Sequence, residues 1–156
     1  MTFKSSLILI AVIALTGWST TTVVLSGTAQ DCFSGNTVPV GGVNVSVFQV
    51  SKARKLVTQL KTMDQEKFLE GDYQAFNRFD TQYSQMVSLV NSTNALARGT
   101  SASNGTFSFT VTSVDSVLVV GYESVEDEPF YYSYKTMGGR SNLSFALDMS
   151  RGGCSR

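Results

Sequence analysis

Asn104-Gly105-Thr106-Phe107-Ser108-Phe109-Thr110-Val111 is the stretch that decides the fold. It opens with an Asn-Gly pair, which supplies the left-handed backbone of a tight turn. After the turn the residues alternate strictly, with Phe107, Phe109 and Val111 on one side and hydroxyl side chains on the other. Because strand side chains point to opposite faces at every second residue, this pattern predicts a β-strand with one apolar and one polar face.

Other stretches on both sides of this strand have strand patterns. Val43–Val50 alternates after a turn at Val38–Gly42, and Leu143–Met149 alternates near the end of the chain. Phe130–Tyr134 is an aromatic strand. Val117–Tyr122 contains a continuous apolar run, which is typical of a strand covered on both faces. The sequence therefore predicts a mainly β domain.

A helical pattern interrupts these strands. From about Ser51 to Arg98 the chain has no Pro and its only Gly is Gly71, while the apolar residues recur at helical spacing. Glu70-Gly71-Asp72 combines a helix C-cap with a following N-cap. We predict an antiparallel helical hairpin inserted at about residues 52–98, and this hairpin is a candidate second cover for the apolar strand. The first helix is marked by Leu56, Val57, Leu60 and Met63, and the second by Phe76, Phe79, Tyr83, Met86, Val87, Val90 and Ala97.

The N-terminus has the features of an export signal. A short basic start precedes Leu7–Leu15, which is an unbroken apolar run. Gly27-Thr28-Ala29 supplies small residues for cleavage before Gln30. This cut would divide the chain into a signal peptide of residues 1–29 and a domain of residues 30–156.

An uncleaved N-terminal anchor is the alternative for the same segment. The uncharged run Leu7–Leu25 is long enough to span a bilayer. The protein is therefore predicted to be secreted or periplasmic, or else membrane-anchored and facing the envelope. Any contact with the membrane would be through this uncleaved N-terminus.

The two cysteines, Cys32 and Cys154, lie near the two ends of the predicted domain. An exported protein with two cysteines usually pairs them, because its compartment is oxidising. A Cys32–Cys154 disulfide would close a long loop, worth at most about 4–5 kcal/mol in the chain-entropy model. It also implies that the first and last strands lie close together. The alternative is two free, buried thiols.

Composition excludes several kinds of chemistry. The 156 residues include 12 Lys+Arg and 12 Asp+Glu, so the basic footprint of a nucleic-acid-binding protein is absent. His is absent, which removes Ser-His and Cys-His nucleophile pairs and histidine metal sites. Two cysteines are too few for a four-cysteine zinc site. We therefore predict no enzymatic activity, no cofactor and no nucleic-acid partner.

The aromatic strand supplies the best candidates for ligand contact, namely Phe130, Tyr131, Tyr132 and Tyr134. On a strand, Phe130, Tyr132 and Tyr134 share one face and Tyr131 takes the other. One face belongs to the core, and exposed rings on the other would stack on a sugar or a peptide. The alternative is that these rings pack against the helical insert.

The densest carboxylate cluster comprises Glu123, Glu126, Asp127 and Glu128. Oxygen-rich loops at the edge of a sandwich hold calcium in some proteins, but the spacing here is not that of an EF-hand. A run of charges is more often a solvated surface loop. We therefore predict no metal site. If the chain does bind a metal ion, these four residues are the candidate ligands.

Two motifs carry a resemblance to a known family. Val38–Val47 reads VPVGGVNVSV and Ser103–Phe109 reads SNGTFSF, and an aromatic strand and a last strand reading LSFALDMS follow them. This order resembles the carboxypeptidase regulatory-like domain, a transthyretin-like β-sandwich that is also similar to the B-type repeats of bacterial surface adhesins. The resemblance implies a sandwich of roughly seven strands used for support, adhesion or ligand contact, without catalysis of its own.

The sequence departs from this family pattern in two ways. The segment read as the helical insertion is longer than the family has at that place. Adhesin repeats often carry a Lys–Asn crosslink, but the first Lys after the signal here is Lys52, so Asn142 has no obvious partner in the first strand. The terminal disulfide is expected to take that mechanical role.

Together these features predict a transthyretin-like antiparallel β-sandwich interrupted by an antiparallel helical hairpin. The predicted function is an exported, non-catalytic binding or structural module of the cell envelope, which contacts a protein or carbohydrate through the hairpin or the exposed aromatics. The alternative is a small envelope metal-binding factor or hydrolase that uses the acidic loop of residues 123–128. A third alternative pairs the apolar face of the insert with its twin in a homo-oligomer.

Overall fold

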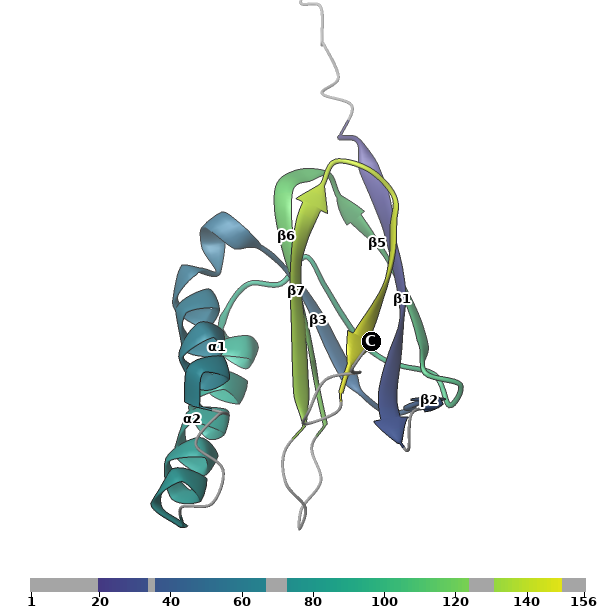
Figure 1. Cartoon of the computed structure of the whole chain (residues 1–156). Helices are drawn as coiled ribbons and strands as arrows, with labels where there is room; N and C mark the ends of the chain where they lie inside the picture. Colours follow the sequence, from purple (N-terminus) through teal and green to yellow (C-terminus); the bar gives the residue numbers. More distant parts are fainter. Residues whose placement is uncertain (1–19, 34–35, 67–72, 124–130, 150–156) are drawn as a thin grey trace, which may run out of the picture.

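The computed structural model describes residues 20–33, 36–66, 73–123 and 131–149 (Figure 1). These residues form three layers, namely two β-sheets and a pair of helices that lies against one of them. The predicted mainly β sandwich with a helical insertion is thus confirmed. In chain order the elements are β1 (Thr22–Phe33), β2 (Asn36–Pro39), β3 (Asn44–Gln49), the 3-10 turn η1 (Val50–Lys52), α1 (Arg54–Glu66), α2 (Tyr73–Ser92), β4 (Ala97–Thr100), β5 (Thr106–Thr112), β6 (Val114–Tyr122), β7 (Tyr132–Gly139) and β8 (Leu143–Asp148).

Sheet A is built around β1. This strand pairs antiparallel with β5 along Thr22–Thr28, antiparallel with β2 at its end, and parallel with β8 along Leu25–Gln30. The expectation that the first and last strands lie side by side is therefore confirmed. This parallel β1–β8 pair corrects the predicted antiparallel pairing at one place in the sandwich. After β7 the chain crosses from sheet B to sheet A, and β8 then runs in the same direction as β1 (Figure 1).

Strand β1 includes residues that the sequence pattern assigns to the export signal. It begins at Thr22, so the boundary expected before Gln30 falls inside it. The side chains of Val23, Leu25 and Ala29 are 3%, 0% and 0% exposed and belong to the core between the sheets. The boundary expected before Gln30 would therefore divide a strand of the described core.

The alternation predicted from Thr106 onward is confirmed in β5. Phe107 and Val111 are buried between the sheets, whereas Thr106, Ser108, Thr110 and Thr112 are exposed. The Phe107 ring packs edge-on against the Phe145 ring of β8, with centroids 5.6 Å apart. The other fully buried side chains of this inter-sheet core include Leu25, Val43, Val45, Val47, Val117, Val119 and Leu147.

Strand β6 is covered on both faces, as its apolar run predicts. Val117 and Val119 pack between the sheets, and Leu118 and Val120 face the helices. Sheet B has the order β4-β3-β6-β7, and the hairpin of α1 and α2 packs on its outer face (Figure 1). Among the helical side chains that the structure describes, those buried there are Leu56, Leu60, Met63, Tyr83, Met86 and Val90.

This packing corrects the homo-oligomer alternative. The apolar face of the hairpin covers Phe48, Leu118 and Val120 of its own sheet. A dimer formed through that face would have to displace it from sheet B, which would leave those three side chains in water. The apolar face is therefore an internal surface of the chain.

The second helix ends earlier than its apolar pattern predicts. Helix α2 stops at Ser92, and Ala97 lies on the short strand β4 instead. The Arg98 guanidinium donates hydrogen bonds to the carbonyls of Val90 and Thr93, at 2.7 and 2.8 Å. Carbonyls in the last turn of a helix have no intrahelical donor, so Arg98 supplies one and marks the point where the chain turns back into sheet B.

The Asn-Gly turn before β5 gives a first testable prediction. Gly105 has φ 76°, and a Cβ there would lie 2.5 Å from the carbonyl oxygen of Ala29. Gly42 has φ 81° with no atom within 4 Å of such a Cβ. We expect Gly42→Ala to lower the free energy of unfolding by about 1–2 kcal/mol, the cost of a left-handed residue. Gly105→Ala should cost about 1–2 kcal/mol more, because the added methyl must push β1 aside. Equal losses in urea unfolding would contradict this.

Candidate functional site

The aromatic strand predicted as a ligand surface lies against the helical hairpin. Tyr132, at the start of β7, is 3% exposed and its hydroxyl donates to Oδ1 of Asp64 on α1, at 3.0 Å. The hydroxyl of Tyr134 donates to Oδ2 of the same carboxylate, at 2.7 Å. The ring of Phe79 on α2 lies 6.2 Å from that of Tyr132, measured between centroids. These four side chains, which we call the Asp64 clamp, join both helices to the edge strand of sheet B.

The electrostatics of the clamp keep its hydroxyls protonated. Burial raises the pKa of Tyr132 and of Tyr134, and the Asp64 carboxylate beside them raises both further. Burial likewise raises the pKa of Tyr83 on α2, whose hydroxyl donates to the carbonyl of Glu123 at 2.5 Å. All three tyrosines therefore act as hydrogen-bond donors at neutral pH.

This arrangement changes how the four predicted contact residues are interpreted. Tyr132 and Tyr134 pack against the hairpin, which is the alternative that the sequence left open. Tyr131 points to the other face of the strand and packs beside the inter-sheet core while staying partly exposed. Phe130 lies outside the described residues. Ligand contact at this strand stays a prediction, and among the described residues it concerns the partly exposed Tyr131 and Tyr134.

Asp64 is the residue of the clamp that sequence reasoning missed. It lies four positions after Leu60, so helical spacing places it on the same face of α1 as the buried residues. A carboxylate on an apolar helix face requires hydrogen-bond donors opposite it. That signal, together with the tyrosines of the aromatic strand, was available in the sequence.

The acidic cluster is described in part. Glu123 ends the β6 region, and its backbone N–H donates to the carbonyl of Tyr131 at 3.0 Å. Burial raises the pKa of the Glu123 carboxyl, and the nearby Asp31 carboxylate raises it further. Glu126, Asp127 and Glu128 lie outside the described residues, so a metal site on this loop stays untested. Within the described ranges no group of three or more metal-binding side chains is arranged to hold an ion.

The predicted disulfide also lies partly outside the described chain. Cys32 belongs to β1, whereas Cys154 falls in the undescribed residues 150–156. The chain leading to Cys154 runs beside the strand of Cys32, since the N–H of Met149 donates to the carbonyl of Gln30 at 2.8 Å. The Cys32–Cys154 bridge stays a prediction, and this pairing favours it.

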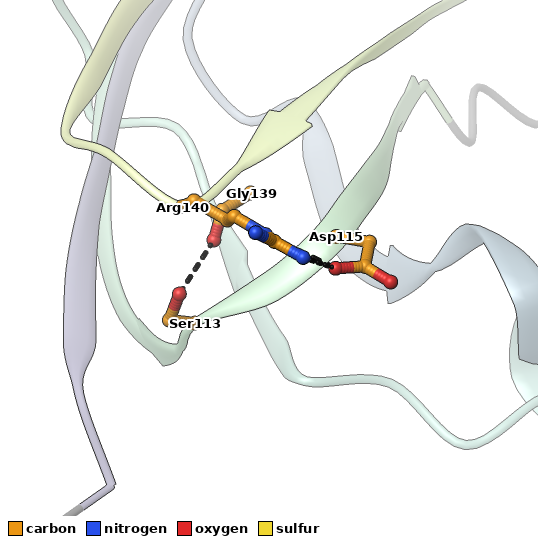
Figure 2. A network of polar contacts seen from close by, with 4 residues as sticks. All are labelled: Ser113, Asp115, Gly139 and Arg140. Atoms are coloured by element: carbon orange, nitrogen blue, oxygen red, sulfur yellow. Dashed lines mark hydrogen bonds and ion pairs between the residues drawn. The ribbon is translucent and has the colours of Figure 1, made fainter.

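A polar network links two turns of the sandwich (Figure 2). The Arg140 guanidinium pairs with Oδ1 of Asp115, with its Nε at 3.0 Å, and the Ser113 hydroxyl donates to the carbonyl of Gly139 at 3.2 Å. The Arg140 and Asp115 side chains are 76% and 83% exposed, so water screens their attraction. We assign this network to holding the β5–β6 turn beside the end of β7.

The outer face of sheet A is left uncovered by the described elements, in contrast to that of sheet B. Strand pairing brings three rows of short, uncharged side chains together there, with Ser26 between Ser108 and Ser144. We call this surface the hydroxyl face. Its members are Thr22, Val24, Ser26 and Thr28 on β1, Thr106, Ser108, Thr110 and Thr112 on β5, and Ser144 and Ala146 on β8.

Comparison with known proteins identifies no family. No family model matches the chain, and no curated protein matches its sequence. The chain resembles the shaft pilin SpaA of Lactobacillus rhamnosus GG, at 12% identity and a TM-score of 0.40 over 82% of this chain and 49% of that one. It resembles GBS52, a minor pilin of Streptococcus agalactiae, at 9% identity and a TM-score of 0.41 over 83% and 44%. The chain thus spans less than half the length of either protein.

No helix in the described ranges is both long enough and apolar enough to cross a membrane.

The clamp gives a second prediction. Asp64→Ala removes the acceptor of two partly buried hydroxyls, so we expect it to lower the free energy of unfolding by about 1–3 kcal/mol. Hydrogen exchange in α1 should rise in the same variant. Asp80→Ala is the matched control, because Asp80 is exposed on α2 and surface changes usually stay within about 0.5 kcal/mol. If the two variants unfold alike in urea, the clamp does not hold the hairpin.

The raised tyrosine pKa values give a third prediction. The folded chain binds the hydroxyl protons of Tyr83, Tyr132 and Tyr134 more tightly than the unfolded chain does. Their contribution to stability is therefore complete below the ordinary tyrosine pKa of about 10, and it is lost as pH rises from there toward the folded-state pKa values. We expect the free energy of unfolding to fall above about pH 10, and to fall less steeply in Tyr132→Phe. Identical slopes for parent and variant in alkaline urea titrations would contradict this.

Proposed function

We propose that the chain is an exported, non-catalytic structural module of the cell surface that contacts a protein partner through the hydroxyl face. One observation carries the proposal: the hairpin covers the outer face of sheet B, whereas the outer face of sheet A presents uncovered rows of short uncharged side chains. Short side chains lose little rotamer freedom when a contact orders them, so such a face binds at a low entropic cost.

The chemistry of the described residues supports a non-catalytic role. The tyrosines whose pKa values the fold raises most donate their hydroxyl protons to acceptors within the chain. The sequence contains no His, which is the commonest general acid or base in enzymes. These hydroxyl groups stabilise the fold by attaching the hairpin to sheet B.

A protein partner fits this surface better than a carbohydrate. Sugars are typically held by exposed aromatic rings. Tyr132 is buried, Tyr134 is engaged by the clamp, and the partly exposed Tyr131 packs beside the inter-sheet core. The hydroxyl face offers hydrogen-bond donors and acceptors over three adjacent strands, which suits a broad contact. A place among the carboxypeptidase regulatory-like sandwiches is part of the proposal, supported by the Asn104-Gly105 turn and the alternating β5.

The test compares two double substitutions that add the same charge. Ser108→Lys with Ser144→Lys places two lysines on the hydroxyl face, on either side of Ser26. Ser84→Lys with Asn91→Lys places two on the exposed side of α2 and serves as the matched control. Equal thermal melts establish that both variants fold.

The readout is chemical crosslinking of the chain in its producing cells. We expect the crosslinked complex to fall at least about tenfold with the hydroxyl-face pair, because a like or unpaired charge at a contact costs several kcal/mol, and to persist with the α2 pair. Loss with the α2 pair alone would overturn the proposed contact surface. A membrane-impermeant amine reagent should also label the exposed Lys55 and Lys61 on intact cells, and an absence of labelling would overturn the surface location.

The response to calcium distinguishes the proposed module from the alternative of a metal-binding factor or hydrolase. A site on the acidic loop of residues 123–128 would raise the melting temperature with added calcium and lower it with a chelator, because an ion that binds the folded state stabilises it. We expect the melting temperature to stay within about 1 °C under both conditions. A calcium-dependent rise that is lost in the Glu126→Ala/Asp127→Ala variant would favour the alternative.

A further inference from the structure

The position of β1 in the sheet has a consequence for maturation of the chain. Residues Thr22–Thr28 pair with β5 on one edge and residues Leu25–Gln30 pair with β8 on the other, so β1 lies between these two strands in sheet A. Within this segment, Leu25 is fully buried and lies opposite Phe109 on β5 and Leu143 on β8. A cut before Gln30 would remove Thr22–Ala29, the part of β1 that joins β5 to β8. A cleavage that keeps this pairing intact therefore lies upstream of Thr22.

The same placement shortens the segment available to span a bilayer. The last four residues of the uncharged run Leu7–Leu25, Thr22–Leu25, belong to β1 and are part of the sheet. The uncharged part that remains, Leu7–Thr21, would form a helix only about 23 Å long at 1.5 Å per residue. The hydrocarbon core of a bilayer is about 30 Å thick, so this length suits the apolar region of a cleaved signal better than a membrane anchor.

We infer that the leader is removed by hydrolysis of the peptide bond between Ser19 and Thr20. Gly17 and Ser19 flank Trp18 in the small-x-small pattern of a cleavage site, shortly after the apolar run ends at Leu15. Water adds across the bond, which leaves a carboxylate on Ser19 and an amino group on Thr20. The catalyst is the leader-removing endopeptidase of the export route.

The new N-terminus fits the described structure. Thr20 and Thr21 are exposed and lie directly before β1, so the charged amino group would stand in solvent. The complete strand and its core side chains stay in the mature chain. This inference concerns processing and stands independently of the proposed hydroxyl-face contact.

The experiment is N-terminal sequencing and intact mass of the exported protein, produced from the full chain with its own leader. We expect the first residue to be Thr20. A first residue of Gln30, any other first residue, or a full-length chain would overturn the assignment.

Two substitutions at one position sharpen this test. Ser19→Arg places a large charge directly before the bond and should raise the ratio of uncut to cut chain at least about tenfold, whereas Ser19→Ala should be cut like the parent. Residue 19 leaves with the leader, so neither change alters the mature domain and a folding defect does not confuse the result. Normal cutting of Ser19→Arg at Thr20 would overturn the inference.

Discussion

A chain that begins at Gln30 will not fold, whereas a chain that begins at Thr20 will unfold cooperatively. The shorter chain lacks Val23, Leu25 and Ala29, all of which are buried between the sheets. Burying a Val or Leu side chain contributes about 1.5–3 kcal/mol. The shorter chain also lacks the backbone ladder between Thr22–Thr28 and β5. Total stabilities of domains are about 5–15 kcal/mol, so the combined loss removes most or all of that margin.

Loss of the strand also separates its neighbours. Strands β5 and β8 both pair with β1, and no pairing between them is present in the described sheet. Circular dichroism and calorimetry of the two chains give the measurement, with a chain beginning at Thr22 as the control, expected to match the one beginning at Thr20. A cooperative melt of the Gln30 chain near the parent's temperature would show that β1 is dispensable, and it would return the cleavage site to Ala29.

Leu118→Ala will loosen the hairpin before it loosens the sandwich. Leu118 is fully buried on the side of β6 that faces the helices. Truncating a buried Leu to Ala lowers the free energy of unfolding by about 2–5 kcal/mol. The loss is the sum of the transfer free energy of the removed atoms and the cost of the cavity that they leave. At roughly 2–4 °C per kcal/mol for a domain of this size, the melting temperature should fall by about 4–20 °C.

The neighbouring residue provides the matched control. Val119 is equally buried but faces sheet A from the same strand. Hydrogen exchange should rise mainly in α1 and α2 for Leu118→Ala, and mainly in β1 and β5 for Val119→Ala, since each cavity opens into a different core. If Leu118→Ala leaves the hydrogen-exchange rates of α1 and α2 unchanged, the hairpin does not depend on sheet B.

Both faces of sheet B are covered, and this affects how a role of the hairpin in binding should be tested. Deleting the hairpin would expose Phe48, Leu118 and Val120 to water. A deletion would therefore report misfolding as well as lost contact. Substitutions on the exposed side of the helices, such as those at Ser84 and Asn91, separate the two effects.

Several features of this fold were predictable from short stretches of sequence. The alternation over 106–112 predicted β5 and the direction of each side chain, and the apolar run at 117–120 predicted a strand with two covers. The helical spacing from Leu56 to Val90 predicted both helices. These features depend on the repeat of side-chain direction along one element, which residues a few positions apart determine.

Other features depended on pairings between distant segments. Thr22–Ala29 continues the uncharged run of the predicted export signal, and hydropathy alone does not distinguish the two. Its pairing with β5 and β8 makes it a strand. The role of Tyr132 depended on Asp64, which lies 68 positions away. The hydroxyl face likewise exists only where three separate strands meet. Local periodicity states which faces of an element are apolar, but the partner of each face is chosen by non-local packing, and only the tertiary structure determines it.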